Sequence, residues 1–219
     1  WYGRGQFGED DTLFRRTQIG LASNPNIAAV FVVSLESVSA ARVAEAIART
    51  GKPVAHVAVQ DVGGTIEAMA HGVRVLLGMV KEASRAPRVA CPLSSLVLGV
   101  ECGGTDTTSG IASNPALGFV ADRVVAAGGT VFLSETSEWM GAEQMLARRA
   151  ESPAVAEAIW TATRRIEADA LARGVDIRGA NPLPDNIRGG ITTLEEKSLG
   201  AIIKGGTTPV RGVLPYATR

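Results

Sequence analysis

Short apolar runs alternate with amphipathic segments along the first two-thirds of the chain. The continuous β-branched and aromatic run at residues 28–33 predicts a strand buried on both faces, because such a strand shows no polar side. Apolar residues three or four positions apart predict helices. The predicted strands are residues 28–33, 54–59, 96–100 and 130–133, and the predicted helices are residues 10–22, 40–49, 66–83, 114–127, 142–150 and 153–173.

Two helix starts are predicted from capping residues. Asn114 is a suitable N-cap and Pro115 suits the first helical position, so a helix is expected to begin there. Thr193 and Glu196 match a capping box at the start of a short helix.

The alternation of strands and helices predicts an α/β fold: an open, mainly parallel sheet with helices on both faces. We expect two parts, residues 1–90 with Rossmann-like βαβ units and residues 91–219 with most of the polar motifs. The alternation stops after Gly174, and residues 181–190 are turn-forming throughout. The C-terminal region is therefore expected to be rich in loops, although its scattered Ile and Leu residues indicate order.

Composition excludes several classes of partner. Lys and Arg total 22, as do Asp and Glu, so no net charge favours nucleic acid or an anionic membrane. No apolar run is long enough to span a bilayer, and the opening Trp1-Tyr2-Gly3-Arg4 does not resemble a signal peptide. Two cysteines, Cys91 and Cys102, cannot build a disulfide framework, which suits a cytoplasmic protein.

The richest chemistry follows the third predicted strand. Ligands of open parallel sheets bind beyond the carboxyl ends of strands. Residues 101–110, Glu-Cys-Gly-Gly-Thr-Asp-Thr-Thr-Ser-Gly, offer a thiol, two carboxylates, hydroxyls and glycines. That mixture suits a divalent ion and a polyhydroxy acid, although a glycine-rich turn with a buried thiol is the alternative. His56 and His71 lie within predicted elements, where packed or surface histidines are expected rather than metal ligands.

Two further segments carry candidate groups. Glu135 and Glu138 follow the fourth predicted strand, and Glu135, nearer the strand end, is the better candidate for a metal ligand or base. The alternative is a solvated loop before a helix. Lys197 falls in the first turn of the short helix, where the helix dipole opposes its charge. It could act as a base or carboxylate anchor, or be an ordinary surface lysine.

Several enzyme classes lack support. Residues 61–65, Asp-Val-Gly-Gly-Thr, could hold an anion, but neither a Gly-x-Gly-x-x-Gly nor a Walker motif is present. The chain also lacks the Gly-x-Ser-x-Gly elbow of serine hydrolases.

Together, the motifs and their order resemble a known family. They are Leu-Ser-Ser-Leu at 93–96 running into Glu-Cys-Gly-Gly-Thr-Asp at 101–106, Ser-Gly-Ile-Ala-Ser-Asn-Pro-Ala-Leu-Gly at 109–118, Ser-Glu at 134–135 with Gly-Ala-Glu at 141–143, and Gly-Gly-Ile-Thr-Thr-Leu-Glu-Glu-Lys-Ser-Leu-Gly at 189–200. Asn-Pro-Asn at 24–26 and Gly-Gly-Thr at 63–65 also fit. The chain is similar to the altronate/galactarate dehydratase family, which also contains the large subunit of sulfolactate sulfo-lyase.

The resemblance covers the central-to-C-terminal portion of the family pattern. The family's opening segment, its small N-terminal domain and its portion beyond Tyr216 are not matched, so the fragment alone could be inactive. Ser34-Leu35-Glu36-Ser37 stands where the family tends to carry a Gly-Cys-Glu-like element.

The resemblance implies metal-assisted β-elimination of water from a sugar acid such as altronate or galactarate. It implies a divalent ion, Fe²⁺ or Mn²⁺ first and Mg²⁺ as a third choice. Our candidate catalytic residues are Lys197, Glu135 and Asp106, and the candidate metal ligands are Cys102, Glu101 and Glu138, with Asp106 and Glu135 as further metal supports. The candidate substrate-binding residues are Thr105, Ser109, Asn114, Gly103, Gly104, Gly190 and Thr192.

Other functions stay open at this point. Elimination of sulfite from a sulfonated hydroxy acid is one alternative, and a non-catalytic sugar-acid-binding or assembly fragment is another. We also expect a homo-oligomer, with a small N-terminal-domain subunit as a possible partner.

Overall fold

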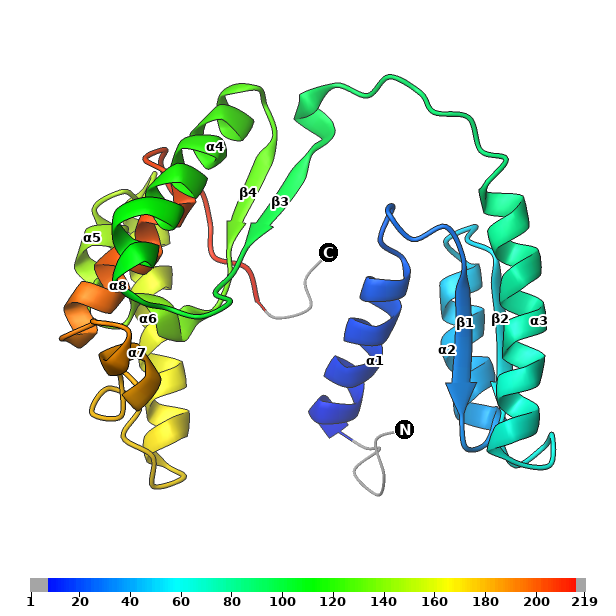
Figure 1. The fold of residues 1–219 in the computed structure, drawn as a ribbon. Helices are drawn as coiled ribbons and strands as arrows, with labels where there is room; N and C mark the ends of the chain where they lie inside the picture. The colour runs from blue at the N-terminus through cyan, green and yellow to red at the C-terminus, as the bar shows by residue number, and fades with distance from the viewer. Residues whose placement is uncertain (1–7, 216–219) are drawn as a thin grey trace. The chain divides into compact units, whose positions relative to one another are not determined.

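The structure is a computed structural model that describes residues 8–215, and it divides into two compact units (Figure 1). Unit 1 runs to Val89 and takes in the end of the chain from Leu214, and unit 2 comprises Ala90–Val213. The opening tetrapeptide Trp1-Tyr2-Gly3-Arg4 and Tyr216 lie outside the described residues.

Unit 1 is a parallel strand pair with three helices. Its elements are α1 (Gly8–Ala22), β1 (Val30–Ser34), α2 (Ser37–Ala48), β2 (Val54–Ala58) and α3 (Thr65–Ala83). β1 and β2 pair in parallel, from Val30 opposite Val54 to Ser34 opposite Ala58, with α2 as the crossover between them. This confirms the predicted βαβ unit.

Two contacts explain the packing of unit 1. Glu36 caps α2 by accepting hydrogen bonds from the backbone N–H groups of Val38 and Ser39, so the helix begins three residues before its predicted start. Gly72 of α3 lets the Phe31 ring approach, because a Cβ there would lie 2.9 Å from Phe31 Cε1. The prediction that β1 is buried on both faces is wrong, since Val33 is 56% exposed.

Unit 2 contains a second parallel pair and most of the helices. Its elements are η2 (Leu93–Ser95), β3 (Val97–Val100), η3 (Ser109–Ser113), α4 (Asn114–Ala126), β4 (Thr130–Leu133), η4 (Thr136–Trp139), α5 (Glu143–Ala147), α6 (Pro153–Leu171), α7 (Pro184–Arg188), α8 (Leu194–Ile202) and η5 (Ile203–Gly205). β3 and β4 pair in parallel from Val97 opposite Thr130 to Val100 opposite Leu133. The α/β class and the parallel pairing are confirmed. The described strands form two separate pairs, however, and not a single sheet.

The core of unit 2 draws on residues distant in sequence. Trp139, Leu146, Ile159 and Ile202 form a buried cluster with Ala142. The Trp139 indole N–H donates to Thr163 Oγ1 at 2.9 Å, which satisfies its polar atom inside the core. Because Ile202 comes from α8, the C-terminal region is ordered as predicted.

Two local predictions are wrong. Asn114 does not cap a helix: the chain is already helical at Thr107, and the Asn114 N–H donates to Ser109 O across the π-helical turn η3. Residues 181–190 are not loop throughout, because Pro184 starts the short helix α7. The cap before these helical turns is Asp106, whose carboxylate accepts the Ser109 N–H at 3.0 Å.

None of the helices within residues 8–215 combines the length and apolar composition that a bilayer crossing needs.

Candidate active site at the strand ends of unit 2

The carboxyl ends of β3 and β4 bring Cys102 and Glu135 together. Glu135 Oε2 accepts a hydrogen bond from the Cys102 backbone N–H at 2.7 Å. Glu135 is also the one non-glycine residue among positions 8–215 with a positive φ, 61°. Left-handed backbone is costly for a residue with a side chain and gathers at functional sites, so the conformation marks Glu135 for attention.

A buried lysine from η5 lies against the same carboxylates. Lys204 is 1% exposed and forms a charged hydrogen bond with Glu138 Oε2. Its Nζ also lies 3.8 Å from Glu135 Oε2. Burial raises the pKa of the Glu138 carboxyl, although the hydrogen bond from Lys204 acts in the opposite direction. A charge this deeply buried requires such partners, because an unpaired ammonium would be too costly there.

Close approach of two helices places Lys204 at this position. Gly118 in α4 carries no Cβ, and one built there would collide with the Ile203 carbonyl oxygen. Gly206 follows η5 with a φ of 71°, a conformation that favours glycine. Thr207 then donates to Asp122 through its N–H, at 2.7 Å, and its hydroxyl, at 2.9 Å. These contacts hold η5 on α4.

The Cys102 thiol links the strand ends to the glycine-rich segment. Its Sγ lies 3.3 Å from Thr105 Oγ1. The Thr105 carbonyl in turn accepts a hydrogen bond from Asn186 Nδ2 at 3.0 Å. Asn186 Oδ1 accepts from Lys197 Nζ at 2.8 Å, and Asn181 Oδ1 accepts from the same ammonium at 2.7 Å. Lys197 is therefore held by neutral amides, and Lys204 by carboxylates.

The segments 101–110 and 181–190 pack directly on each other. The Thr107 N–H donates to the Gly189 carbonyl at 3.0 Å, and the Thr107 hydroxyl donates to the same oxygen at 3.1 Å. A Cβ on Gly189 would lie 2.8 Å from Asp106 Cβ. Gly190 has a φ of 95°, and a Cβ there would collide with the Thr107 hydroxyl. The glycines thus have a packing role independent of any substrate.

Asp106 is occupied as a helix cap. Its Oδ1 accepts from the Thr108 hydroxyl at 2.7 Å and the Ser109 N–H at 3.0 Å. The hydrogen bond from Thr108 is the largest influence that holds the pKa of Asp106 below its usual range. A carboxylate stabilised in this way is a weak base, so the geometry favours a capping role over the predicted catalytic one.

The other predicted residues are more scattered. Asn114 Nδ2 donates to the Gly200 carbonyl at 2.9 Å. The Glu196 carboxylate accepts hydrogen bonds from both the N–H and the hydroxyl of Thr192. The Thr193 side chain caps α8, as predicted. Glu101, Gly103 and Gly104 are exposed.

Lys204 was not among the residues predicted from the sequence, although its ammonium contacts Glu138 and lies near Glu135. One signal was available: it is a lysine between Ile202-Ile203 and Gly205-Gly206, an apolar and glycine setting in which a charge needs a reason. The amides of Asn181 and Asn186 were also missed, because turn-forming residues were interpreted only as loop.

A metal site is not evident from these donors. Within residues 8–215, no group of three or more His, Cys, Asp or Glu side chains is placed to hold an ion. His71 packs beside Phe31, with ring centroids 6.1 Å apart, and His56 is exposed.

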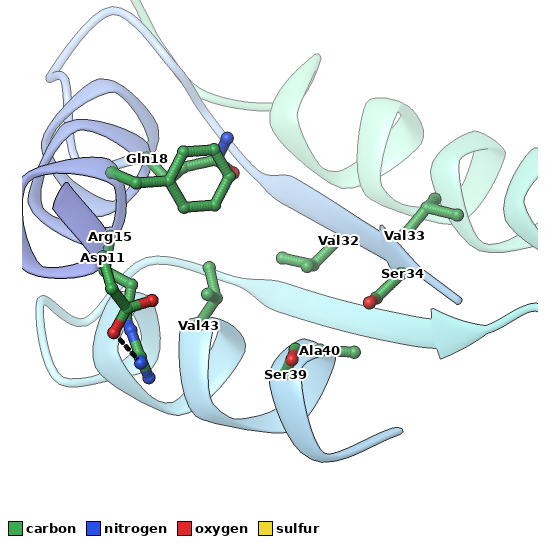
Figure 2. A pocket seen from close by; sticks show the side chains of 10 residues that line it. Asp11, Arg15, Gln18, Val32, Val33, Ser34, Ser39, Ala40 and Val43 are labelled. Carbon is green, nitrogen blue, oxygen red and sulfur yellow. Dashed lines mark hydrogen bonds and ion pairs between the residues drawn. The ribbon is translucent and has the colours of Figure 1, made fainter. Parts of the chain in front are cut away.

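Unit 1 has a small pocket of its own, about 50 Å³ in volume (Figure 2). Its lining side chains come from α1, β1 and α2. Within it, Arg15 and Asp11 pair with each other, and the buried Ser34 hydroxyl has no hydrogen-bond partner. The charged groups here neutralise each other, which leaves the neutral polar side chains of Gln18, Ser34 and Ser39 in the lining.

Comparison with family models finds two matches. Residues 93–219 match the model described as D-galactarate/Altronate dehydratase, C-terminal. Residues 1–84 match the model described as D-galactarate dehydratase/Altronate hydrolase, second domain.

Two of three individual relatives match over nearly all of the chain. It is 38% identical to (2R)-sulfolactate sulfo-lyase subunit beta of Chromohalobacter salexigens, over 99% of this chain and 56% of the relative. It is 36% identical to the altronate dehydratase of Escherichia coli, over 100% of this chain and 44% of the relative. It is also 36% identical to galactarate dehydratase (L-threo-forming) of Escherichia coli, over 64% of this chain and 27% of the relative. The chain thus spans about half the length, or less, of these curated relatives.

Proposed function

Because the chain belongs to the D-galactarate/altronate dehydratase family, we propose that it forms the part of a lyase that removes water from a sugar acid such as altronate or galactarate. The observation that carries the proposal is the left-handed Glu135, whose carboxylate meets the Cys102 N–H beyond the paired strands. A strained residue with an acid–base side chain at a strand end is a typical catalytic arrangement.

The proposed reaction is a β-elimination. A base takes the proton from the carbon next to the substrate carboxylate, and the electron pair of that C–H bond forms an enediolate. The C=C bond then forms as the β-hydroxyl leaves with a proton as water, and the enol becomes the 2-keto-3-deoxy acid. The α-proton is weakly acidic, so positive charge near the enediolate is essential.

Glu135 is our candidate base. Its side chain is 33% exposed, so it remains accessible to a ligand, whereas the Glu138 side chain is only 12% exposed. The hydrogen bond from Cys102 and the ion pair with Lys204 fix its orientation. A fixed base contributes about 10²- to 10⁴-fold to such a rate.

Lys197 is our candidate anchor for the substrate carboxylate. Its ammonium has three donors, of which Asn181 and Asn186 take two. The third is available for a carboxylate oxygen. The candidates for contacts with substrate hydroxyls remain Thr105, Ser109, Gly190 and Thr192. Two of them, Thr105 and Gly190, lie in the segments that join Lys197 to the strand ends.

The divalent ion implied by the resemblance, Fe²⁺, Mn²⁺ or Mg²⁺, stays a prediction. Its candidate ligands were Cys102, Glu101 and Glu138, but the Glu138 carboxylate is bonded to Lys204 and Glu101 is exposed. The described residues do not by themselves fit a divalent ion. The proposed elimination is therefore assigned to side chains of the protein, without a bound ion.

A second candidate reaction is elimination of sulfite from a sulfonated hydroxy acid. The 38% identity to the sulfo-lyase subunit beta supports it. Both reactions begin with removal of the proton next to the carboxylate, so the same residues would serve both. We also propose a small N-terminal-domain subunit as a partner of this chain. The assembly is proposed to be a homo-oligomer located in the cytoplasm.

The decisive experiment measures α-proton exchange and product formation with the chain in its full-length natural protein. Altronate, galactarate and (2R)-sulfolactate are incubated in D₂O and followed by NMR and by sulfite release. Glu135→Gln should lower turnover by about 10²-fold or more. The matched control, Glu157→Gln, removes a carboxylate from the exposed face of α6 and should leave turnover unchanged.

Two results would contradict the proposal. Full activity in Glu135→Gln would remove it as the base. Tight binding of one acid, without exchange or product, would instead favour a sugar-acid-binding module.

A further inference from the structure

Lys204 is the most deeply buried charged residue in the part of the chain that the structure describes, at 1% exposure. Two carboxylates face it, Glu138 through a direct hydrogen bond and Glu135 with its Oε2 3.8 Å away. The local charge is therefore one ammonium against two carboxylates. Within residues 8–215, Lys204 is the one cation paired with these two carboxylates.

One oxygen of each carboxylate that could bind a metal ion already has a hydrogen-bond partner. Glu138 Oε2 is the acceptor for the ammonium, and Glu135 Oε2 accepts the Cys102 N–H at 2.7 Å. A divalent ion bridging the two carboxylates would have to lie close to Lys204 Nζ. Repulsion between two cations at that separation is strong in a site shielded from water.

We propose that Lys204 is the resident cation of this strand-end site and that its ammonium keeps divalent ions off Glu135 and Glu138. The positive charge available to an anionic ligand is then part of the chain itself. This departs from the expectation that Glu138 and Cys102 hold an ion. The proposal about Lys204 concerns the charge of the site and not its substrate. It can therefore be wrong while the proposed reaction is correct, and the reverse also holds.

The first test titrates the wild-type chain with Mn²⁺ and follows free Mn²⁺ by electron paramagnetic resonance. The wild-type chain and Glu138→Gln should give the same titration, with no saturable site that depends on Glu138. A wild-type site that Glu138→Gln abolishes would overturn the proposal. This arm needs no Lys204 variant, so it is decisive even if such a variant fails to fold.

The second test removes the ammonium. Lys204→Met and Lys204→Gln, checked for folding by circular dichroism and tryptophan fluorescence, should bind Mn²⁺ at least about tenfold more tightly than the wild type. Adding Glu138→Gln should abolish the gain. Lys197→Met is the matched control, because that ammonium contacts amides and no carboxylate, and it should gain nothing. A folded Lys204 variant that shows no gain would overturn the proposal.

Discussion

Each unit is built around a parallel strand pair, but the residues at the end of β1 in unit 1 and of β4 in unit 2 are used differently. In unit 1 the carboxyl end of β1 carries Ser34, whose hydroxyl is buried without a partner. In unit 2 Ser134, directly after β4, donates its hydroxyl to the Val100 carbonyl at 2.9 Å. Glu36 of unit 1 uses its carboxylate to cap α2, whereas Glu135 of unit 2 turns into a left-handed conformation and extends to Cys102.

The difference lies in which element packs beside the strand ends. In unit 1, α1 contributes Arg15 and Asp11, which satisfy each other. In unit 2, η5 contributes Lys204, which has no acidic partner in its own segment and must use Glu138 and Glu135. A strand end becomes a candidate site when the neighbouring element delivers a charge that only the strand end can balance.

The largest effect is expected from removing that charge. Lys204→Met leaves Glu138 buried without its partner and should lower the free energy of unfolding by about 3–5 kcal/mol. Arg15→Met, the counterpart in unit 1, removes an arginine whose side chain is 27% exposed and leaves Asp11 in the first turn of α1, where the helix dipole favours negative charge, so a smaller loss is expected. Urea denaturation followed by circular dichroism and tryptophan fluorescence measures both. Equal losses would remove the distinction between the units.

The next effect comes from glycines at helix contacts. Gly118→Ala places a methyl group against the Ile203 backbone, which cannot move without displacing η5, so a loss of about 1–3 kcal/mol is expected. Gly72→Ala in unit 1 meets only the Phe31 ring, which can shift, and alanine is the better helix former. Thermal unfolding should therefore show a smaller loss for Gly72→Ala, and the reverse order would refute this explanation.

A smaller effect is expected from the two serines. Ser134→Ala removes the hydrogen bond to Val100 and should cost about 0.5–1.5 kcal/mol. Ser34→Ala removes a buried hydroxyl that has no partner, so its stability should be unchanged or slightly higher. Chemical denaturation of the pair decides the matter, and a clear loss in Ser34→Ala would mean that its hydroxyl is bonded in solution.

The smallest effect concerns pH. Hydrogen bonds from Thr108 and Ser39, respectively, lower the pKa values of the caps Asp106 and Glu36. A lowered folded-state pKa gives stability that is present above the ordinary pKa and is lost as pH falls through the folded value. Both units should thus weaken as acid protonates their caps. Asp106→Asn, which cannot titrate, should flatten this decline in urea midpoints between about pH 7 and about pH 3. An unchanged slope would contradict the capping role.

Much of the local structure was predictable from short-range chemistry. Residues 130–133 were predicted as a strand with its observed bounds, because a β-branched run follows Gly128-Gly129. Thr193 was predicted as a cap and accepts the Glu196 N–H at 3.1 Å. α4 begins at Asn114 as predicted, but Asn114 is not its N-cap, because the chain is already helical from Thr107, after the cap at Asp106.

The candidate site was only half predictable. Glu135 and Cys102 follow strands, so their proximity comes from parallel pairing, which the alternation of strands and helices already indicates. Their roles in catalysis are still predictions. The αL backbone of Glu135 could not be inferred, because nothing in Ser134-Glu135-Thr136 calls for a positive φ.

The sequence alone determined the α/β class, the order of strands and helices and the family resemblance, since these depend on local periodicity and short motifs. Only the tertiary structure decided that Lys204 joins Glu138, 66 residues away, because that contact depends on η5 packing onto α4 at Gly118. It likewise decided that Lys197 contacts amides and not acids. Buried charges meet where backbone segments pack closely, as η5 packs on α4 at Gly118. Because the packed segments are far apart in the sequence, the local sequence of either one does not predict the contact.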